Sequence, residues 1–292
     1  MSDNTQEMNA PKRRTKTGET WKRLKKNKLA VIGLITLLLI IFLAIFAEQI
    51  APYSYSEQDY SNTFQGPSKE HWMGTDNYGR DILSRVIFGT RVSLQIGFIS
   101  LLGGAFIGCV LGAIAGYFGG IVDTLIMRVS DILMSIPRTV LAIAIATTLG
   151  AGITNAMIAV AISSVPNFAR VVRASTLTVK DQEYVEAARC LGAKSPHIIT
   201  RHIFPNVMAP IIVQATLGVG TSIILAAALS FLGLGVQLPT PEWGSMLSAA
   251  RTYMRDYPYM VAFPGLAIMV TVLALNFFGD GLRDALDPKL KK

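Results

Sequence analysis

Residues 139–169 read TVLAIAIATTLGAGITNAMIAVAISSVPNFA, an uncharged run of 31 residues that is broken by Gly150 and Gly152. A helix needs about 20 mostly apolar residues to cross a hydrocarbon core about 30 Å thick. The run is too long for one helix with such a break and too short for two full spans. If it belongs to two membrane-spanning helices, the first must begin earlier and carry Arg138, and the second begins near Ile153.

The composition of the whole chain is typical of an integral membrane protein. Of the 292 residues, 51% are hydrophobic and 16% are charged, whereas a soluble domain has roughly 25% charged residues. The mean hydropathy of +0.43 also excludes a disordered chain. Two cysteines and three histidines are too few for a disulfide framework or a zinc cluster. We therefore expect free thiols and no metal site.

Four further apolar segments complete a set of six expected spans, at residues 29–47, within 92–122, from about 206 to 229–234, and at 257–279. Lys and Arg concentrate in short cytoplasmic segments. Six spans with both termini in the cytoplasm place 19 of these residues inside and 6 outside, whereas five spans place 11 inside and 14 outside. The sequence therefore predicts an all-α membrane protein with six transmembrane helices.

This topology divides the chain into five parts. We expect a basic cytoplasmic tail (1–28), an additional N-terminal transmembrane helix (29–50), an extracytoplasmic segment (51–91), a core of five helices (92–280) with a cytoplasmic loop at 170–205, and a cytoplasmic tail (281–292). Because basic residues in a membrane protein first report topology, the net charge of +8 gives no reason to expect nucleic acid as a partner. The expected partners are membrane lipid and protein.

The cytoplasmic loop is expected to form two short helices. Asp181 is a suitable cap for the first, which presents Tyr184, Ala188 and Leu191 at helical spacing. Gly192 suits the position after a helix end, where a positive φ is needed. The second helix is expected to have Ser195 as its cap and Pro196 at its first position, and Pro205 to mark the entry to the fifth span.

Two interpretations of this loop remain open from its local features. A helix–turn–helix between two membrane spans is suited to docking, since the small Ala187 and Ala188 permit close approach and the charged Glu186 and Arg189 fix the register of a partner. The alternative is an amphipathic loop that lies on the membrane surface.

The spacing of Glu186-Ala187-Ala188, Gly192 and Pro205 resembles the EAA loop of ABC-importer permeases. His202 and Phe204 stand where the general pattern has Ile and Leu, and this His-Ile sequence resembles the peptide-importer branch. Residues 71–94, 230–247 and 276–288 (HWMGTDNYGRDILSRVIFGTRVSL, SFLGLGVQLPTPEWGSML and NFFGDGLRDALDP) are similar to the dipeptide/oligopeptide/nickel permeases, and the basic tail with the first helix is similar to their second permease subunit.

The resemblance implies a type I ABC-importer permease fold in a bacterial or archaeal cytoplasmic membrane. It implies that the loop couples the chain to an ATP-hydrolysing subunit through Tyr184, Glu186, Ala187, Ala188, Arg189, Gly192 and Pro205. The implied partners are a second permease subunit, two ATP-binding subunits and an extracytoplasmic solute-binding protein. Di- or oligopeptides are the leading cargo, with nickel chelates or glutathione-like solutes as alternatives. Because the chain has no phosphate-binding loop, ATP and magnesium are expected on the partner subunits.

Glycine recurs every four residues in the second span, at positions 104, 108, 112 and 116. Such a stripe lets helix backbones approach closely where lipid provides no hydrophobic drive. We interpret Gly104, Gly108, Gly112 and Gly116 as a helix-packing surface rather than as substrate contacts.

Arg138 is expected near the middle of the bilayer, where a charge costs about 2.5–3.5 kcal/mol on insertion scales. One hypothesis is a cation that lines the translocation path and meets a carboxylate or carbonyl of the cargo. The alternative is an internal partner, Asp131, which lies seven residues earlier on the same helix face. Asp123, Arg128 and Asp131 are otherwise expected as inner-interface charges, with Arg128 and Asp131 paired at i, i+3.

On the outer side, Asp76, Arg80 and Asp81 are expected to form a charged turn before an amphipathic helix. Trp72 and Trp243 fit an outer aromatic belt, and Trp21 an inner one. Glu242 and Trp243 are candidate contacts for a substrate-delivering protein, on position alone.

A stand-alone secondary transporter is a remote alternative, and it predicts inverted repeats and several buried acids, which the sequence lacks. An intramembrane enzyme is weaker still, because no His/Asp/Glu or Ser/Lys cluster lies within the spans. We expect no catalytic residue in this chain.

Overall fold

The computed structural model describes residues 16–286, which fold into helices joined by loops, with one isolated β-bridge between Thr75 and Asp81. The helices are α1 (Lys16–Lys26), α2 (Lys28–Ile45), α3 (Ala47–Ile50), η1 (Tyr60–Asn62), α4 (Ile82–Phe118), α5 (Gly120–Ser135), α6 (Arg138–Leu149), α7 (Ile153–Val179), α8 (Glu183–Cys190), α9 (Ser195–Ile198), η2 (Ile199–Ile203), α10 (Phe204–Phe231), α11 (Trp243–Ala250), η3 (Arg251–Tyr253) and α12 (Tyr259–Leu286). Within this part of the chain five helical segments are long and apolar enough to cross a membrane, and the bent pair α5–α6 makes a sixth. The prediction of an all-α membrane protein is confirmed.

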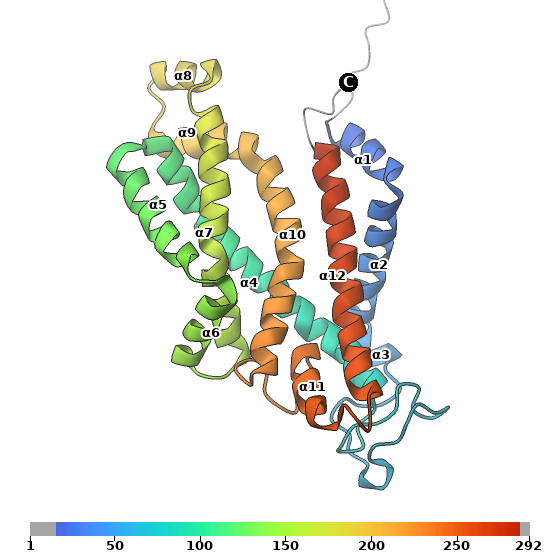
Figure 1. Cartoon of the computed structure of the whole chain (residues 1–292). Coiled ribbons are helices and arrows are strands. Elements are labelled where there is room, and N and C mark those ends of the chain that lie inside the picture. Colours follow the sequence, from blue (N-terminus) through green and yellow to red (C-terminus); the bar gives the residue numbers. More distant parts are fainter. Residues whose placement is uncertain (1–15, 287–292) are drawn as a thin grey trace, which may run out of the picture.

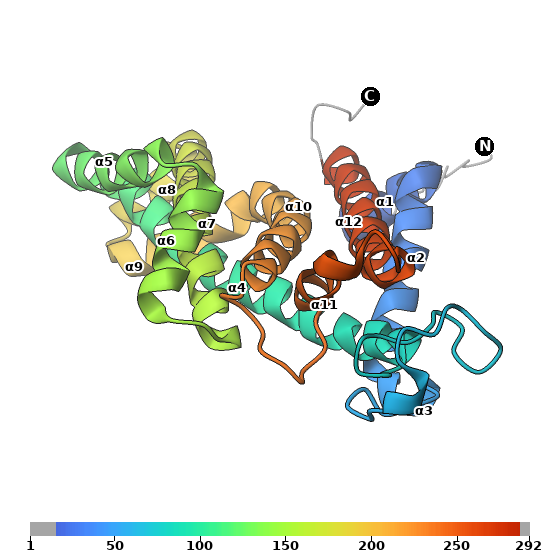
Figure 2. The ribbon, with the colours of Figure 1, turned by 60° about the horizontal axis from the view of Figure 1, so that its bottom comes forward.

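The helices form two groups that are bridged by α4. Figures 1 and 2 show α5 to α9 on one side, α1, α2 and α12 on the other, and α10 between them. The long helix α4 runs obliquely across both groups (Figure 1). The helices α1, α8 and α9 and the last turns of α12 lie at one end of the molecule, whereas residues 51–81 and α11 lie at the other.

Helix α4 is longer than expected, because it has 37 residues and begins at Ile82 rather than near residue 92. Asp81 caps it by accepting a hydrogen bond from the Ser84 amide at 2.7 Å. At 1.5 Å per residue, α4 extends for about 55 Å, so an oblique path lets it cross a hydrocarbon core about 30 Å thick. Residues 82–91, the end of the expected extracytoplasmic segment, are therefore the first turns of this helix.

The expectation that a single helix carries Arg128, Asp131 and Arg138 is wrong. Helices α5 and α6 meet at an angle of 93°, and Ile136 between them is extended, with φ −92° and ψ 129°. Pro137 causes this break, because proline disfavours the helical conformation of the preceding residue and has no N–H to donate. Arg138 is consequently the first residue of a new helix.

The four spaced glycines of α4 lie against α7. A Cβ added at Gly108 would lie 2.6 Å from the carbonyl oxygen of Val165, and one at Gly116 would lie 2.7 Å from Cβ of Thr176. Added Cβ atoms at Gly104 and Gly112 would likewise meet backbone atoms of α7. The glycines therefore let the two helix backbones approach more closely than any larger residue would permit.

Helix α11 is packed into the protein rather than displayed at its outer surface. Trp243 and Glu242 are each 1% exposed, and the Trp243 indole donates to the carbonyl oxygen of Val86 at 3.1 Å. The Glu242 carboxylate caps α11 by accepting from the Gly244 and Ser245 amides at 2.9 and 2.8 Å. Burial raises the pKa of Glu242, against the opposing effect of these amide donors.

The interpretation of Trp243 as a belt residue, and of Glu242 and Trp243 as contacts for another protein, is therefore wrong. Both side chains form hydrogen bonds that join α11 to α4. Trp72 is 71% exposed and Trp21 is 47% exposed, as an interfacial position requires.

We expect Gly108→Ala to destabilise the protein by about 1–3 kcal/mol, because the new methyl group overlaps the backbone of α7. Gly103→Ala is the matched control, since its Cβ would lie 3.6 Å from Cβ of Ala161, an ordinary contact. The control should gain up to about 1 kcal/mol from the better helix propensity of alanine. Thermal unfolding of the two variants in the same detergent checks this, and equal melting temperatures would contradict the close packing.

Candidate functional site

The short helix α8 is held to the rest of the chain by its two buried side chains. Val185 and Ala188 are 0% and 9% exposed, and Val185 belongs to the same apolar cluster as Ile198 and Ile203. Tyr184 and Leu191 are exposed, so the expected face of Tyr184, Ala188 and Leu191 is not a single surface. The reason is that Val185, and not Tyr184, is the residue that pairs with Ala188 on the inner face.

The outward surface of α8 carries both charged side chains of the motif. Tyr184, Glu186, Ala187, Arg189, Gly192 and Pro205 are exposed, whereas Ala188 is buried. Gly192 has φ +81°, as expected after a helix end, and its amide donates to the Arg189 carbonyl oxygen at 3.0 Å. The guanidinium of Arg189 lies 5.9 Å from the centre of the Tyr117 ring, which ties α8 to the end of α4.

The expected caps of the two loop helices are wrong. Gln182 rather than Asp181 precedes α8, and it makes no side-chain cap. Lys194 precedes α9, so that Ser195 is the first helical residue and Pro196 follows it in the first turn. The helix then continues through η2 into α10, with Pro205 inside the first turn of α10. Pro205 removes one backbone donor from this continuous helix, and it lies just after the π-helical turn of η2, where the regular hydrogen-bond pattern is already altered.

Arg138 is held by hydroxyl groups from two other helices. Its Nε donates to Ser163 Oγ on α7 at 3.4 Å, its Nη1 to Thr221 Oγ1 on α10 at 3.1 Å, and its Nη2 to Ser222 Oγ at 3.3 Å. All three acceptors are neutral. The sequence gives no signal for these contacts, because serine and threonine in apolar spans also commonly bond to their own helix backbone.

The internal partner proposed for Arg138 is wrong, because Asp131 bonds to Arg170 of α7 at 2.7 Å. The expected Arg128–Asp131 pair is wrong for the same reason. Asp123 is likewise paired, to Arg173 of α7, with 2.6 Å between Oδ2 and Nη2. The bend at Pro137 turns α5 so that its acids face α7 instead of α6. Sequence spacing within α5 gives no signal for these contacts.

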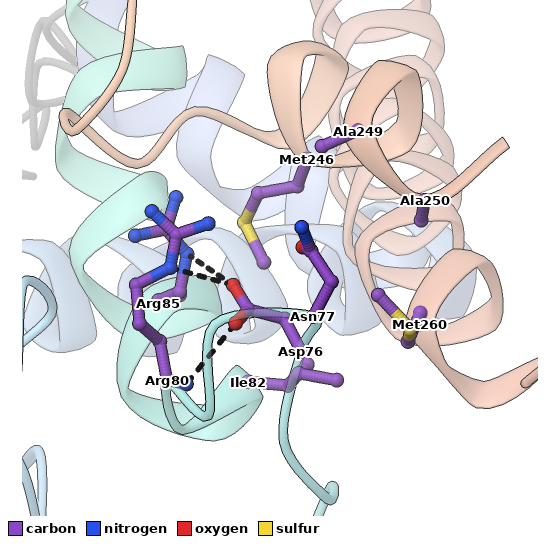
Figure 3. Close-up of a pocket in the computed structure, with 9 residues that line it drawn as sticks. All are labelled: Asp76, Asn77, Arg80, Ile82, Arg85, Met246, Ala249, Ala250 and Met260. Carbon is purple, nitrogen blue, oxygen red and sulfur yellow. Dashed lines mark hydrogen bonds and ion pairs between the residues drawn. The ribbon is translucent and has the colours of Figure 1, made fainter. Parts of the chain in front are cut away.

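At the opposite end, a buried charge cluster joins three segments of the chain (Figure 3). The Asp76 carboxylate accepts from Arg80 Nε at 2.7 Å and lies 3.8 Å from Arg85 Nε. Arg85, which the sequence analysis did not single out, also donates to the carbonyl oxygens of Tyr55 and Pro239 at 2.8 and 3.3 Å. Asp76, Arg80 and Arg85 are at most 7% exposed.

This cluster lines a small pocket between the start of α4, α11 and α12, with a cavity volume of about 20 Å³. It is formed by Asp76, Asn77, Arg80, Ile82, Arg85, Met246, Ala249, Ala250 and Met260. Asp81 lies beside it and contacts His71 Nδ1 at 3.0 Å. The expected charged turn before a helix is therefore present, and it is structural: the acid and both guanidinium groups are satisfied within the chain. The residues 16–286 contain no group of His, Cys, Asp and Glu able to hold a metal ion.

Comparisons with known proteins decide the family. Residues 108–292 match the family described as binding-protein-dependent transport system inner membrane component, and residues 15–67 match the N-terminal transmembrane domain of oligopeptide transport permease C. The chain belongs to this family of transport permeases. It is an inner-membrane protein and a transport subunit rather than an enzyme, and it works with other subunits of a transport system.

Relatives cover nearly the whole permease. The dipeptide transport system permease protein DppC of Alkalihalophilus pseudofirmus is 53% identical over 273 residues, which are 94% of this chain and 90% of the relative. The glutathione transport system permease protein GsiD of Escherichia coli is 51% identical over 279 residues, 95% and 92% of the two chains. The MetNI methionine ABC transporter, in inward-facing conformations, superposes with a TM-score of 0.57 at 19% identity over 70% of this chain and 98% of that chain, which shows the permease fold.

We expect Asp76→Asn to destabilise the permease by about 3–5 kcal/mol, because it leaves two buried guanidinium groups without a carboxylate and turns an amide N–H toward Arg80. Glu48→Gln is the matched control: its pair with Arg91 is exposed, with side chains 66% and 42% accessible, and its loss should cost at most about 1 kcal/mol. Thermal unfolding in detergent distinguishes the two, and a stable Asp76→Asn variant would show that the cluster contributes little.

Proposed function

We propose that this permease is the membrane subunit of an ABC importer for di- or oligopeptides. The observation that supports this cargo is the 53% identity to a dipeptide permease over almost the full length of both chains. Glutathione-like solutes are the second candidate, because relatives named as glutathione permeases are 51% identical over the same extent. Nickel chelates are a third candidate, on resemblance alone.

The proposed assembly contains a second permease subunit, two ATP-binding subunits and an extracytoplasmic solute-binding protein. ATP and magnesium bind to the partner subunits, in keeping with the lack of a phosphate-binding loop in this chain. The end of the molecule that carries α1, α8, α9 and the last turns of α12 (Figure 1) faces the cytoplasm. The basic residues that lie at this end support that orientation.

In this assembly the exposed face of α8 is the surface on which an ATP-binding subunit docks. Glu186 and Arg189 are both exposed, so both charges are accessible to a partner, although the guanidinium of Arg189 also lies over the Tyr117 ring. Ala187 is exposed beside them and permits close approach. Gly192 ends the helix with a positive φ and so sets the limit of the docking surface.

Glu186→Lys reverses one of these charges, and we expect it to abolish coupling of ATP hydrolysis to transport or to prevent assembly. Insertion of the chain into the membrane should be unchanged, because the Glu186 side chain is exposed. Glu48→Lys at the opposite end is the control and should leave ATPase coupling intact. Normal transport by the Glu186→Lys variant in reconstituted vesicles would refute the assignment of α8.

Purification of the tagged permease in mild detergent should recover a second six-span protein and ATPase subunits. In vesicles the recovered complex should import a labelled dipeptide only with ATP and the binding protein. Competition by unlabelled glutathione or a nickel chelate ranks the alternative cargoes. Recovery of this chain alone, active without ATP, would contradict the importer assembly, whereas an ATP-driven complex that ignores dipeptides would contradict only the cargo.

A further inference from the structure

Polar side chains follow one face of α7 and one face of α10 within their apolar spans. On α7, Ser163 is followed four residues later by Asn167, whose side chain is exposed. On α10, Gln214 precedes the exposed Thr221 by seven residues, which is two helical turns. An amide exposed to hydrocarbon loses its hydrogen bonds at a cost of several kcal/mol, so this face is suited to water or cargo rather than lipid tails.

The same two faces continue into a large pocket at the end of the molecule that carries α8. The pocket has a cavity volume of about 390 Å³ and is open to solvent, and its lining residues are Val171, Ala209, Pro210, Val213, Gln214, Leu217, Arg283 and Leu286. Val171 lies one turn beyond Asn167 on α7, and Leu217 lies one turn before Thr221 on α10. The polar face and the pocket therefore form one track, which extends about 10 Å along α10 from Gln214 to Thr221.

Arg138 lies at the end of this track that is farther from the pocket, because two of its three hydrogen-bond acceptors, Ser163 and Thr221, belong to the polar faces. A guanidinium has five N–H groups, and three are donated to hydroxyls, which leaves two. Arg138 forms no ion pair within residues 16–286. The two acids of α5 form ion pairs with α7 instead, Asp131 with Arg170 and Asp123 with Arg173.

The position of Arg138 is unfavourable for a cation on two counts. It is half-buried in a membrane-spanning region, where an unpaired charge is expensive. It is also the first residue of α6, and the positive end of a helix dipole disfavours a positive charge. A neutral amide has two N–H groups and could donate to two of these hydroxyls without either cost, so the hydroxyls alone do not account for a charged side chain. An anion at this position removes both.

We propose that Arg138 binds a carboxylate of the cargo at the end of the α7–α10 track that is farther from the pocket. This inference rests on the proposed import of peptides, whose terminal carboxylate matches the fork of an arginine, with two N–H groups directed at two oxygens. Ser163, Thr221 and Ser222 are positioning residues that hold the guanidinium. The pocket beyond them receives the cargo as it leaves toward the cytoplasmic end.

The test measures the charge preference of the track without relying on transport. Leu217→Cys places a thiol in the pocket, one turn from Thr221, in a chain whose Cys109 and Cys190 are replaced by alanine and serine. The assembled importer is treated with anionic sulfonatoethyl or cationic trimethylammonioethyl methanethiosulfonate, and labelling of this chain is measured. The ratio of anionic to cationic rates should be at least about tenfold higher with Arg138 than with Arg138→Gln, because one buried charge at short range shifts both rates in opposite directions. Arg138→Lys is the control that keeps the charge and the ratio.

An unchanged ratio in Arg138→Gln, or a thiol that reacts with neither reagent, would overturn the proposal. An acid of the partner permease that already neutralises Arg138 would give the same unchanged ratio. A second measurement keeps Arg138 intact: a dipeptide with a free carboxylate should slow the labelling, and its C-terminal amide should not. If Arg138→Gln prevents assembly, the peptide measurement alone tests the proposal. Equal slowing of the labelling by the dipeptide and by its C-terminal amide would then overturn it. A high ratio without protection by either peptide supports the anion site and contradicts the peptide cargo.

Discussion

The close contact between α4 and α7 is the interaction on which the other features of this permease depend. Lipid tails are as apolar as leucine, so helices in a bilayer associate through close van der Waals contact rather than through the hydrophobic effect. The four glycines of α4 provide that contact by letting α7 approach its backbone. Once α7 is fixed in this way, Arg170, Arg173 and Ser163 are brought to the partners on α5 and α6 that they bind.

Charges are treated differently at the ends of the molecule and in its middle. At one end Asp76 is shared by Arg80 and Arg85, and at the other Asp123 and Asp131 are each paired with an arginine of α7. In each of these contacts a guanidinium faces a carboxylate, both in the buried Asp76 cluster and in the half-exposed Asp131–Arg170 pair. Arg138 departs from this rule, since only hydroxyl groups face it. The hydroxyl groups fix the position of the guanidinium but do not neutralise its charge. This leaves the charge available to bind an anion, as proposed above.

Hydropathy and charge placement were sufficient to predict the all-α membrane fold, because every apolar segment of about 20 residues must be a helix in lipid. Positive φ at Gly192 was also predictable, since it depends only on the local end of α8. The break at Pro137 has a local signal in the proline itself, and the expectation of one helix through Arg128, Asp131 and Arg138 is wrong because it passes over that proline. The burial of Trp243 and Glu242 and the pairing of Asp131 with Arg170 depend on residues far away in sequence, and no spacing within α11 or α5 reveals them.

Helix α8 and Arg138 are connected through one continuous helical rod. Helix α9, η2 and α10 follow one another without a gap from Ser195 to Phe231, and α8 packs on the start of this rod through Val185 and its cluster with Ile198 and Ile203. The same rod carries Thr221 and Ser222, which hold two of the three N–H groups that Arg138 donates. A partner that moves α8 acts on α10 through this contact and on α4 through Arg189 and Tyr117. Pro210 and the π-helical turn of η2 are the places where the rod bends most easily. Because Thr221 lies on α10 and Ser163 on α7, a movement of α10 relative to α7 changes the distance between the two hydroxyls. The guanidinium bridges these two hydroxyls, so its hold on an anion cannot stay constant while the loop moves.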